Sequence, residues 1–135
     1  PPGMAITIEA VVRPRRAVVV LNLVRGDAVT GPRRRDLVPG GAAWRVDFVL
    51  AGRGRRTVEV SLARPEPPPL ARDRALALDA DVVCLRVVEA GGDGGPGAPA
   101  EPAGTLCGRL NNVARRLPLA GGDTLVAMFA WPGYR

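Results

Sequence analysis

Residues Ala42–Pro65, AAWRVDFVLAGRGRRTVEVSLARP, decide the fold class because apolar and polar side chains alternate along both halves of the segment. Apolar residues occupy every second position: Trp44, Val46, Phe48 and Leu50, then Val58, Val60 and Leu62. A period of two is typical of a strand with one buried face. A short arginine-rich stretch with Gly52 and Gly54 joins the two runs, so we predict a β-hairpin with a polar turn.

Alternating or β-branched runs predict further strands on both sides of this hairpin. They are Met4–Val12, Ala17–Val24, Asp123–Trp131 and one or two strands within Ala75–Ala90, where Val82–Val88 has the clearest pattern. Ala17–Val24 is apolar on both faces, which indicates a central strand covered on both sides.

Proline and glycine concentrate in three segments that we predict as loops: Arg25–Gly41, Arg64–Arg74 and a flexible loop at 91–104. The segment Thr105–Leu119 is ambiguous. Four of its apolar residues are spaced as on one face of a helix, which favours a short helix ended by Pro118.

The pattern therefore contains six to eight short strands and at most one short helix. It predicts an all-β fold, either a β-sandwich of the Ig-like or jelly-roll-like kind or a compact barrel. A chain of 135 residues is the usual size of one domain. We accordingly expect residues 1–135 to form a single β-rich domain, with aliphatic side chains filling the core because aromatic residues make up only 4% of the chain.

The basic residues have an unusual composition. All 19 are arginine, the chain has no lysine or histidine, and the formal net charge is +6. Arginine, alanine, glycine and proline have GC-rich codons, so this bias indicates a GC-rich genome, such as that of an actinobacterium or a GC-rich herpesvirus. The charge would still attract anionic partners.

The two cysteines, Cys84 and Cys107, allow one disulfide that the sequence alone does not establish. Cys84 lies in an apolar run, where a buried thiol is the ordinary interpretation. We expect no membrane span, because no apolar run approaches the roughly 18 residues that a spanning helix needs.

The residue types argue against catalysis. Most hydrolytic sites use histidine as a base or a metal ligand, and this chain has none. Asp79 and Asp81 would share one face of a strand and could hold a cation or share a proton, although a solvated turn between two strands is the favoured explanation. We therefore expect a protein that is not an enzyme and that needs no metal or cofactor.

Clusters of arginine are the candidate contacts for an anion or a protein partner. They comprise Arg13, Arg15, Arg16, Arg33, Arg34, Arg35, Arg53, Arg55 and Arg56. All nine fall in predicted loops. If the strands run up and down, Arg13–Arg16 and Arg53–Arg56 lie at one end of the domain and form a basic rim that binds phosphate or carboxylate groups. Solvation of the loops accounts for the same residues without any function.

Three short stretches resemble the herpesviral dUTPase-related proteins: Val18–Val29, Ala42–Phe48 and the closing Pro132–Arg135. The resemblance implies a small all-β domain, in some members without catalytic activity. The nucleotide-binding motif of that family would need an aspartate just before Pro132, where this chain has Trp131. Gly108–Asn112 only partly matches the phosphate-binding motif, so the resemblance does not imply activity.

These observations predict a non-catalytic protein-interaction or structural domain within a larger assembly, such as a multidomain chain, a secretion apparatus or a virion. Its partner would be another protein or further copies of itself, in an intracellular or virion-associated setting. One alternative is weak, sequence-independent binding of nucleic acid or another polyanion through the loop arginines. The other is a dUTPase-related domain of a GC-rich herpesvirus, with or without catalytic activity.

Overall fold

The fold was taken from a computed structural model, which describes residues 14–50, 54–63, 82–90 and 101–133. Eight strands occur in this part of the chain: β1 (Ala17–Arg25), β2 (Ala28–Leu37), β3 (Trp44–Leu50), β4 (Gly54–Ala63), β5 (Val82–Glu89), β6 (Glu101–Arg109), β7 (Arg115–Pro118) and β8 (Thr124–Ala130). A single 3-10 turn, η1 (Ala120–Gly122), precedes β8.

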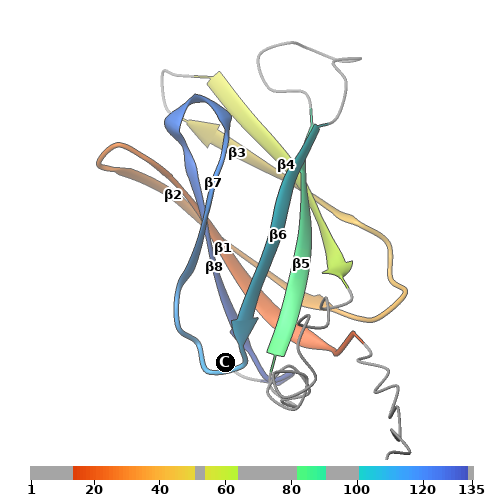
Figure 1. The fold of residues 1–135 in the computed structure, drawn as a ribbon. Coiled ribbons are helices and arrows are strands. Elements are labelled where there is room, and N and C mark those ends of the chain that lie inside the picture. Colours follow the sequence, from red (N-terminus) through yellow and green to blue (C-terminus); the bar gives the residue numbers. More distant parts are fainter. Residues whose placement is uncertain (1–13, 51–53, 64–81, 91–100, 134–135) are drawn as a thin grey trace, which may run out of the picture.

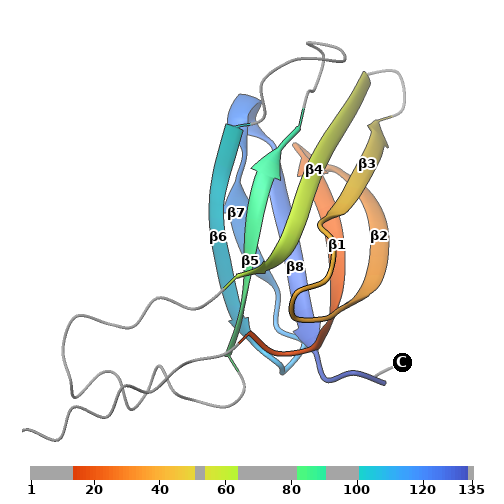
Figure 2. The ribbon, with the colours of Figure 1, turned by 90° about the vertical axis from the view of Figure 1, so that its right-hand side faces the viewer.

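The strands form two antiparallel four-stranded sheets that pack face to face (Figures 1 and 2). Sheet A has the order β2-β1-β8-β7 and sheet B the order β3-β4-β5-β6. The predicted all-β sandwich is thus confirmed, and the sheets do not close into a barrel. Among the described residues, no helix is long and apolar enough to cross a membrane.

Most strands pair with the next one in sequence, and β8 returns to pair with β1. The ladder is interrupted at two places, between β2 and β3 and between β6 and β7, where the chain passes from one sheet to the other. The sandwich therefore has two open sides, visible at the right and left of Figure 2.

The predicted hairpin is present as β3 and β4. Trp44 lies opposite Val60 and Leu50 opposite Gly54, with an unbroken register between these pairs. Val46, Phe48 and Leu50 are buried, as the alternation predicts. The central part of the turn, residues 51–53, lies outside the described residues.

One apolar core fills the space between the sheets. Its largest fully buried side chains come from both sheets: Phe48, Phe129, Leu21, Leu23, Leu85 and Leu125. Burying side chains of this size contributes about 1.5–3 kcal/mol each before entropic costs. The core therefore rests on aliphatic residues and two phenylalanines, in keeping with the low aromatic content.

The predicted loop at Arg25–Gly41 is wrong over most of its length. Residues Ala28–Leu37 form β2, which pairs antiparallel with β1 after a tight turn at Gly26 and Asp27. The register shifts between Leu21 and Leu23, next to the cis Gly31–Pro32 peptide. An edge strand tolerates this interruption because one side of its backbone needs no partner.

The predicted helix at Thr105–Leu119 is also wrong. Thr105–Arg109 belongs to β6, and Arg115–Pro118 forms β7. Leu106, Gly108 and Leu110 are buried while their neighbours are exposed, so the same segment also has a period of two. Pairing of Thr105–Arg109 with β5 and of Arg115–Pro118 with β8 selects the strands, because these two ladders satisfy the backbone groups of both parts.

Two further predictions are confirmed in part, and three lie outside the described residues. β1 is central in sheet A, as predicted, but its outer face is only partly covered: Val20, Asn22 and Val24 are half-buried. The flexible loop predicted at 91–104 is contradicted from Glu101 onward, where β6 begins. The predicted strand Met4–Val12, the loop at 64–74 and the Asp79–Asp81 pair lie outside the described residues.

Candidate binding surfaces

Four charged side chains close one end of the sandwich. Arg25 ends β1, Arg56 and Glu89 lie on β4 and β5, and Asp123 precedes β8. Arg25, Arg56 and Glu89 each lie an even number of residues from the core-facing positions of their own strand. All three side chains therefore point between the sheets. Two cations and two anions thus meet where the apolar core ends.

Asp123 is the centre of this cluster. Its carboxylate accepts hydrogen bonds from Arg25 Nε at 2.8 Å and Arg25 Nη2 at 2.9 Å, and Arg56 Nη1 lies 3.5 Å away. Arg56 also pairs with Glu89 and donates to the Ala120 carbonyl oxygen at 2.7 Å. These contacts join strands of both sheets to the turn before β8.

The hydrogen bond from Arg25 lowers the pKa of Asp123 from its ordinary value of 3.8, and the positive charges of Arg25 and Arg56 act in the same direction, although burial opposes them. The Asp123 side chain is fully buried, and both of its cationic partners are largely buried. Each charged group of this cluster has a partner of opposite charge, and such a network contributes to the stability of the fold.

Arginines also cover the open side between β2 and β3. Arg33 and Arg35 lie opposite the core-facing residues Leu21 and Val19 of β1, so they point toward sheet B. The Cζ atom of Arg33 lies 5.8 Å from the centre of the Phe48 ring, and that of Arg35 lies 5.7 Å from the Trp44 ring. Both contacts have cation–π geometry, and they shield the aromatic edge of the core from water.

The second open side, between β6 and β7, is covered in a similar way. Arg115 lies opposite Ala127 and Leu117 opposite Leu125, both core-facing residues of β8. A Cβ atom added at Gly108 of β6 would lie 3.0 Å from Arg115 Cγ and 2.8 Å from Phe129 Cδ2. The absence of a side chain at Gly108 therefore lets β7 approach β6.

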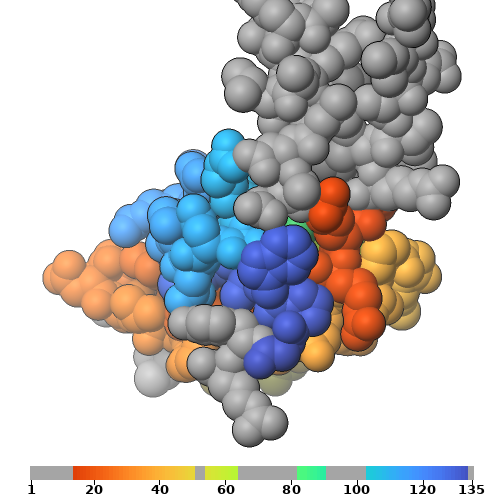
Figure 3. Space-filling view, turned by 90° about the horizontal axis from the view of Figure 1, so that it is seen from below, coloured from red at the N-terminus to blue at the C-terminus, as the bar shows by residue number. Residues whose placement is uncertain are grey.

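The structure separates the arginines that were predicted to act together. Arg15 and Arg16 precede β1, at the end that Figure 3 views, whereas Arg55 and Arg56 begin β4 at the opposite end. The predicted basic rim is therefore wrong for the described members, and Arg13 and Arg53 lie outside the described residues. The predicted loop position of the nine arginines is wrong for those on β2 and β4: Arg33, Arg34, Arg35, Arg55 and Arg56.

The outer face of sheet A, called here the sheet A face, is mainly apolar. Val20 and Val24 of β1 lie beside Met128 and Thr124 of β8, and Val126 lies between them opposite Asn22. These side chains are half-buried. Val29 of β2, opposite Val24, is 65% exposed and extends the apolar surface.

Charged side chains flank the sheet A face on both edges. Arg34 of β2 lies opposite Val20, and Arg116 of β7 lies opposite Val126; both are exposed. Asp36, also exposed, lies next to Arg34 on the same face, opposite Val18. An aliphatic centre with arginine at the edges is typical of a protein-binding surface.

The outer face of sheet B is polar by contrast. Arg45 and Glu59 form an ion pair across β3 and β4 at 3.9 Å, and the Thr57 hydroxyl donates to the Asp47 carboxylate at 2.5 Å. Arg86 and Arg109 are exposed on β5 and β6. Thr57 and Cys84 of the same face are buried, so water reaches only part of it.

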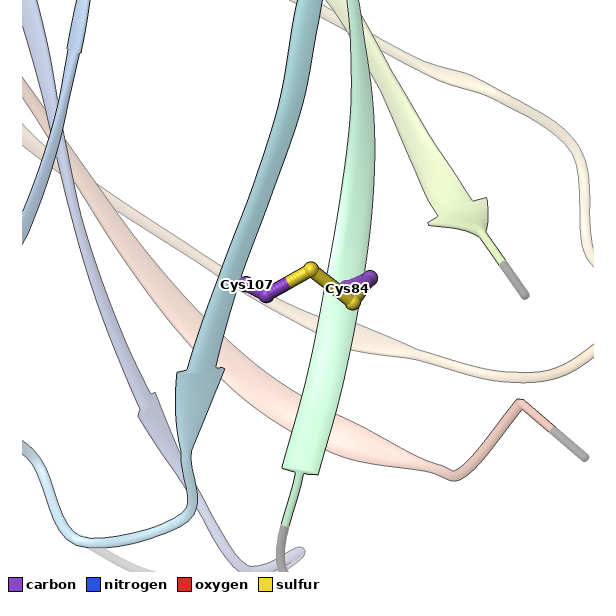
Figure 4. Close-up of a disulfide and its surroundings, with 2 residues drawn as sticks. All are labelled: Cys84 and Cys107. Carbon is purple, nitrogen blue, oxygen red and sulfur yellow. A yellow bond between two sulfur atoms is a disulfide. The ribbon is translucent and has the colours of Figure 1, made fainter. Parts of the chain in front are cut away.

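A disulfide joins Cys84 of β5 to Cys107 of β6 (Figure 4). The two residues lie directly opposite each other in the ladder, on the face that points away from the core. Cys84 is buried, as its apolar surroundings predict, but it is bonded rather than a free thiol.

Sequence reasoning missed the charged end cluster. The sequence pattern predicts Asp123 at the start of a strand, Glu89 within the strand-forming segment Ala75–Ala90 and Arg25 at the start of a loop. A signal was present for Arg25, because it continues the alternation Ala17, Val19, Leu21 and Leu23 and so falls on the core face. No spacing in the sequence connects Arg25 with Asp123, which is 98 residues away.

No known protein family, curated protein or solved structure matches this chain. The resemblance to the herpesviral dUTPase-related proteins therefore has no support from these comparisons and stays a prediction. Function has to be argued from the surfaces described above.

Proposed function

We propose that this domain is a non-catalytic binding module that attaches to another protein through the sheet A face. The observation that carries the proposal is the contrast between the two outer faces. Aliphatic side chains form the centre of one, whereas the described part of the other carries the Arg45–Glu59 ion pair and the Thr57–Asp47 hydrogen bond, with Val49 as an exposed apolar residue near the end of β3. A half-exposed aliphatic sheet face gains free energy when a partner covers it, at roughly 25 cal/mol per Å² of apolar area.

The flanking charges indicate the chemistry of the partner. Arg34 and Arg116 stand on opposite edges of the face, and the chain has a net charge of +6. A partner with an apolar centre and acidic residues around it would satisfy both arginines. A second copy would bring its own arginines and the same net charge, so the occupant we propose is a different, acidic protein.

The disulfide bears on where such an assembly would be found. Disulfides persist in oxidising compartments and are rare in the cytosol. The Cys84–Cys107 bond therefore supports an assembly outside the cytosol, such as a cell surface, a secretion apparatus or a virion, over an intracellular one.

Matched charge insertions on the two faces test the proposal. Val126→Glu places a carboxylate in the centre of the sheet A face, and Val49→Glu places one on sheet B, where Val49 is 61% exposed. Proteins captured from the native host by the wild-type chain would be purified. The dissociation constants of their complexes with the wild-type chain and with each of the two variants would then be measured. We expect Val126→Glu to weaken binding at least tenfold and Val49→Glu to leave it unchanged.

If Val126→Glu bound the partner as tightly as the wild-type chain does, the sheet A face would be refuted as the binding site. Circular dichroism and the unfolding midpoint establish that each variant is folded before its binding is interpreted. A captured partner that is basic rather than acidic would also contradict the proposed chemistry.

Nucleic-acid binding remains the second prediction. The described arginines are spread over two ends and two faces of the domain, so no observation specifically favours this function. A random oligonucleotide tests it directly, because backbone-driven binding at about 50 mM salt should be lost by about 200 mM. Absence of binding at the lower concentration would remove that alternative.

A further inference from the structure

β3 differs from the other three edge strands in having no feature that prevents further pairing. β2 is interrupted by a register shift beside Pro32, and β6 contains Pro102 next to a register shift in its ladder with β5. β7 has only four residues and ends at Pro118. These are the usual devices that keep sheet edges from pairing with other chains.

β3, Trp44–Leu50, runs for seven residues without proline, glycine or any register shift. It pairs with β4 on one side only, and no other described strand pairs with it. Alternate backbone N–H and C=O groups along β3 therefore point away from β4, in the arrangement that an added strand would use.

The charges beside this edge select what could be added. Arg33 and Arg35 reach from β2 over the rings of Phe48 and Trp44 on β3, on the core side of that strand. Neither guanidinium lies within ion-pair distance of a carboxylate in the described part of the chain. Within the described ranges, two arginines thus lie without an anionic partner beside a strand edge that pairs with no other strand.

We propose that the free edge of β3 binds an extended acidic segment of a partner protein by strand addition. The segment would hydrogen-bond to the β3 backbone and turn every second side chain toward the gap between the sheets. Side chains two residues apart on a strand are about 6.5 Å apart. Glutamate or aspartate at two such positions would meet Arg33 and Arg35, which are themselves two residues apart on β2.

Pairing with β3 of a second copy fits this edge less well. The core-side positions of β3 are Trp44, Val46, Phe48 and Leu50, and they already pack inside their own sandwich. A second copy would therefore bring no carboxylate to Arg33 and Arg35 from those positions. Both chains would also carry the same net positive charge.

The test uses the full chain and a synthetic peptide of alternating valine and glutamate, with a valine–lysine peptide as the control. Trp44 reports binding directly, because it lies under Arg35 on β3. The chain has only one other tryptophan, Trp131, so Trp131→Phe makes the fluorescence specific to Trp44. Amide hydrogen exchange of the β3 residues gives a second, independent readout.

We expect the glutamate peptide to change Trp44 fluorescence and to slow exchange of alternate β3 amides, and the lysine peptide to do neither. Arg33→Ala combined with Arg35→Ala should weaken binding at least tenfold. Arg86→Ala should leave it unchanged, because Arg86 is exposed on β5 and faces away from the core.

Three results would overturn the proposal: equal binding of both peptides, unchanged binding by the folded double variant, or protection of amides in sheet A instead of β3. Concentration-dependent dimerisation without peptide binding would assign the edge to a second copy and would equally refute it. This site is separate from the sheet A face, so Val126→Glu should not affect the peptide, and either proposal can fail alone.

Discussion

Replacing Asp123 with asparagine tests whether the charged end cluster holds the two sheets together. The substitution keeps the size of the side chain but removes the charge that receives Arg25 at 2.8 and 2.9 Å and attracts Arg56. The new amide N–H₂ group would face guanidinium N–H donors, so the change leaves donors opposite donors.

The expected loss of stability follows from the burial of the three groups. Removing one partner of a buried ion pair costs about 3–5 kcal/mol, mostly because the remaining charge stays uncompensated. The Arg25 side chain is 28% exposed and that of Arg56 is 16% exposed, so water compensates part of the loss. We expect about 3 kcal/mol, a large part of the roughly 5–15 kcal/mol that stabilises a domain.

Urea unfolding at pH 7 measures this loss. With a slope of about 1–3 kcal/mol per M, a loss of about 3 kcal/mol lowers the midpoint by about 1–3 M. Glu59→Gln is the matched control, because the Arg45–Glu59 pair spans 3.9 Å and both side chains are well exposed. Its effect should stay below about 1 kcal/mol.

The pH dependence provides a second check on the same residue. The folded protein lowers the pKa of Asp123. The stability that the ionised Asp123 carboxylate contributes is therefore present above the ordinary pKa of 3.8 and is lost as the pH falls through the pKa of the folded state. The stability difference between wild type and Asp123→Asn should therefore narrow below about pH 4. A variant within 1 kcal/mol of wild type at pH 7 would refute the structural role of the cluster.

Two further predictions concern sheet B and its disulfide. Gly108→Ala should destabilise the fold by about 1–3 kcal/mol, because the new methyl group would lie 2.8 Å from the buried Phe129 ring. Thr105→Ala on the same strand is the control and should have little effect. Equal unfolding midpoints of the two variants would contradict the close approach of β7 to β6. Reducing Cys84–Cys107, which are separated by 23 positions, should lower stability by about 3 kcal/mol in calorimetry or denaturant unfolding, since the unfolded chain regains the entropy of that loop. A Cys84→Ala, Cys107→Ala variant should match the reduced protein, and indifference of wild type to reductant would show that the bond is absent in solution.

The local sequence pattern was sufficient wherever one face of a strand is buried. Trp44–Leu50 and Val58–Leu62 alternate so regularly that the β3–β4 hairpin and its core face follow from the sequence. β8 follows from its β-branched and aliphatic run, and β5 from Val82–Val88. At these positions the residue pattern and the tertiary environment favour the same backbone.

The pattern failed where a strand lies at a sheet edge or carries glycine and proline. β2 contains Gly31 and Pro32, which indicate a loop unless a neighbouring strand is known, and β6 and β7 carry leucines at a spacing that also fits a helix. Propensity is weak in such segments, so the free energy of pairing with β1, β5 and β8 decides the structure.

The candidate surfaces depended more strongly on the fold. The sequence supplied the arginines and their number, but their separation onto opposite ends and opposite faces follows from strand register. The ion pairs of Arg25 and Arg56 with Asp123 join residues far apart in the chain.

The sequence by itself determined an all-β fold with an aliphatic core and no histidine, and it left a sandwich and a barrel as alternatives. Tertiary structure alone decided which arginines are packed over aromatic rings, which are paired and which remain exposed beside the sheet A face. The physical reason is that alternation fixes only which face of a strand is buried. Contacts between charges depend on which strands become neighbours, and that is settled by the packing of the whole chain.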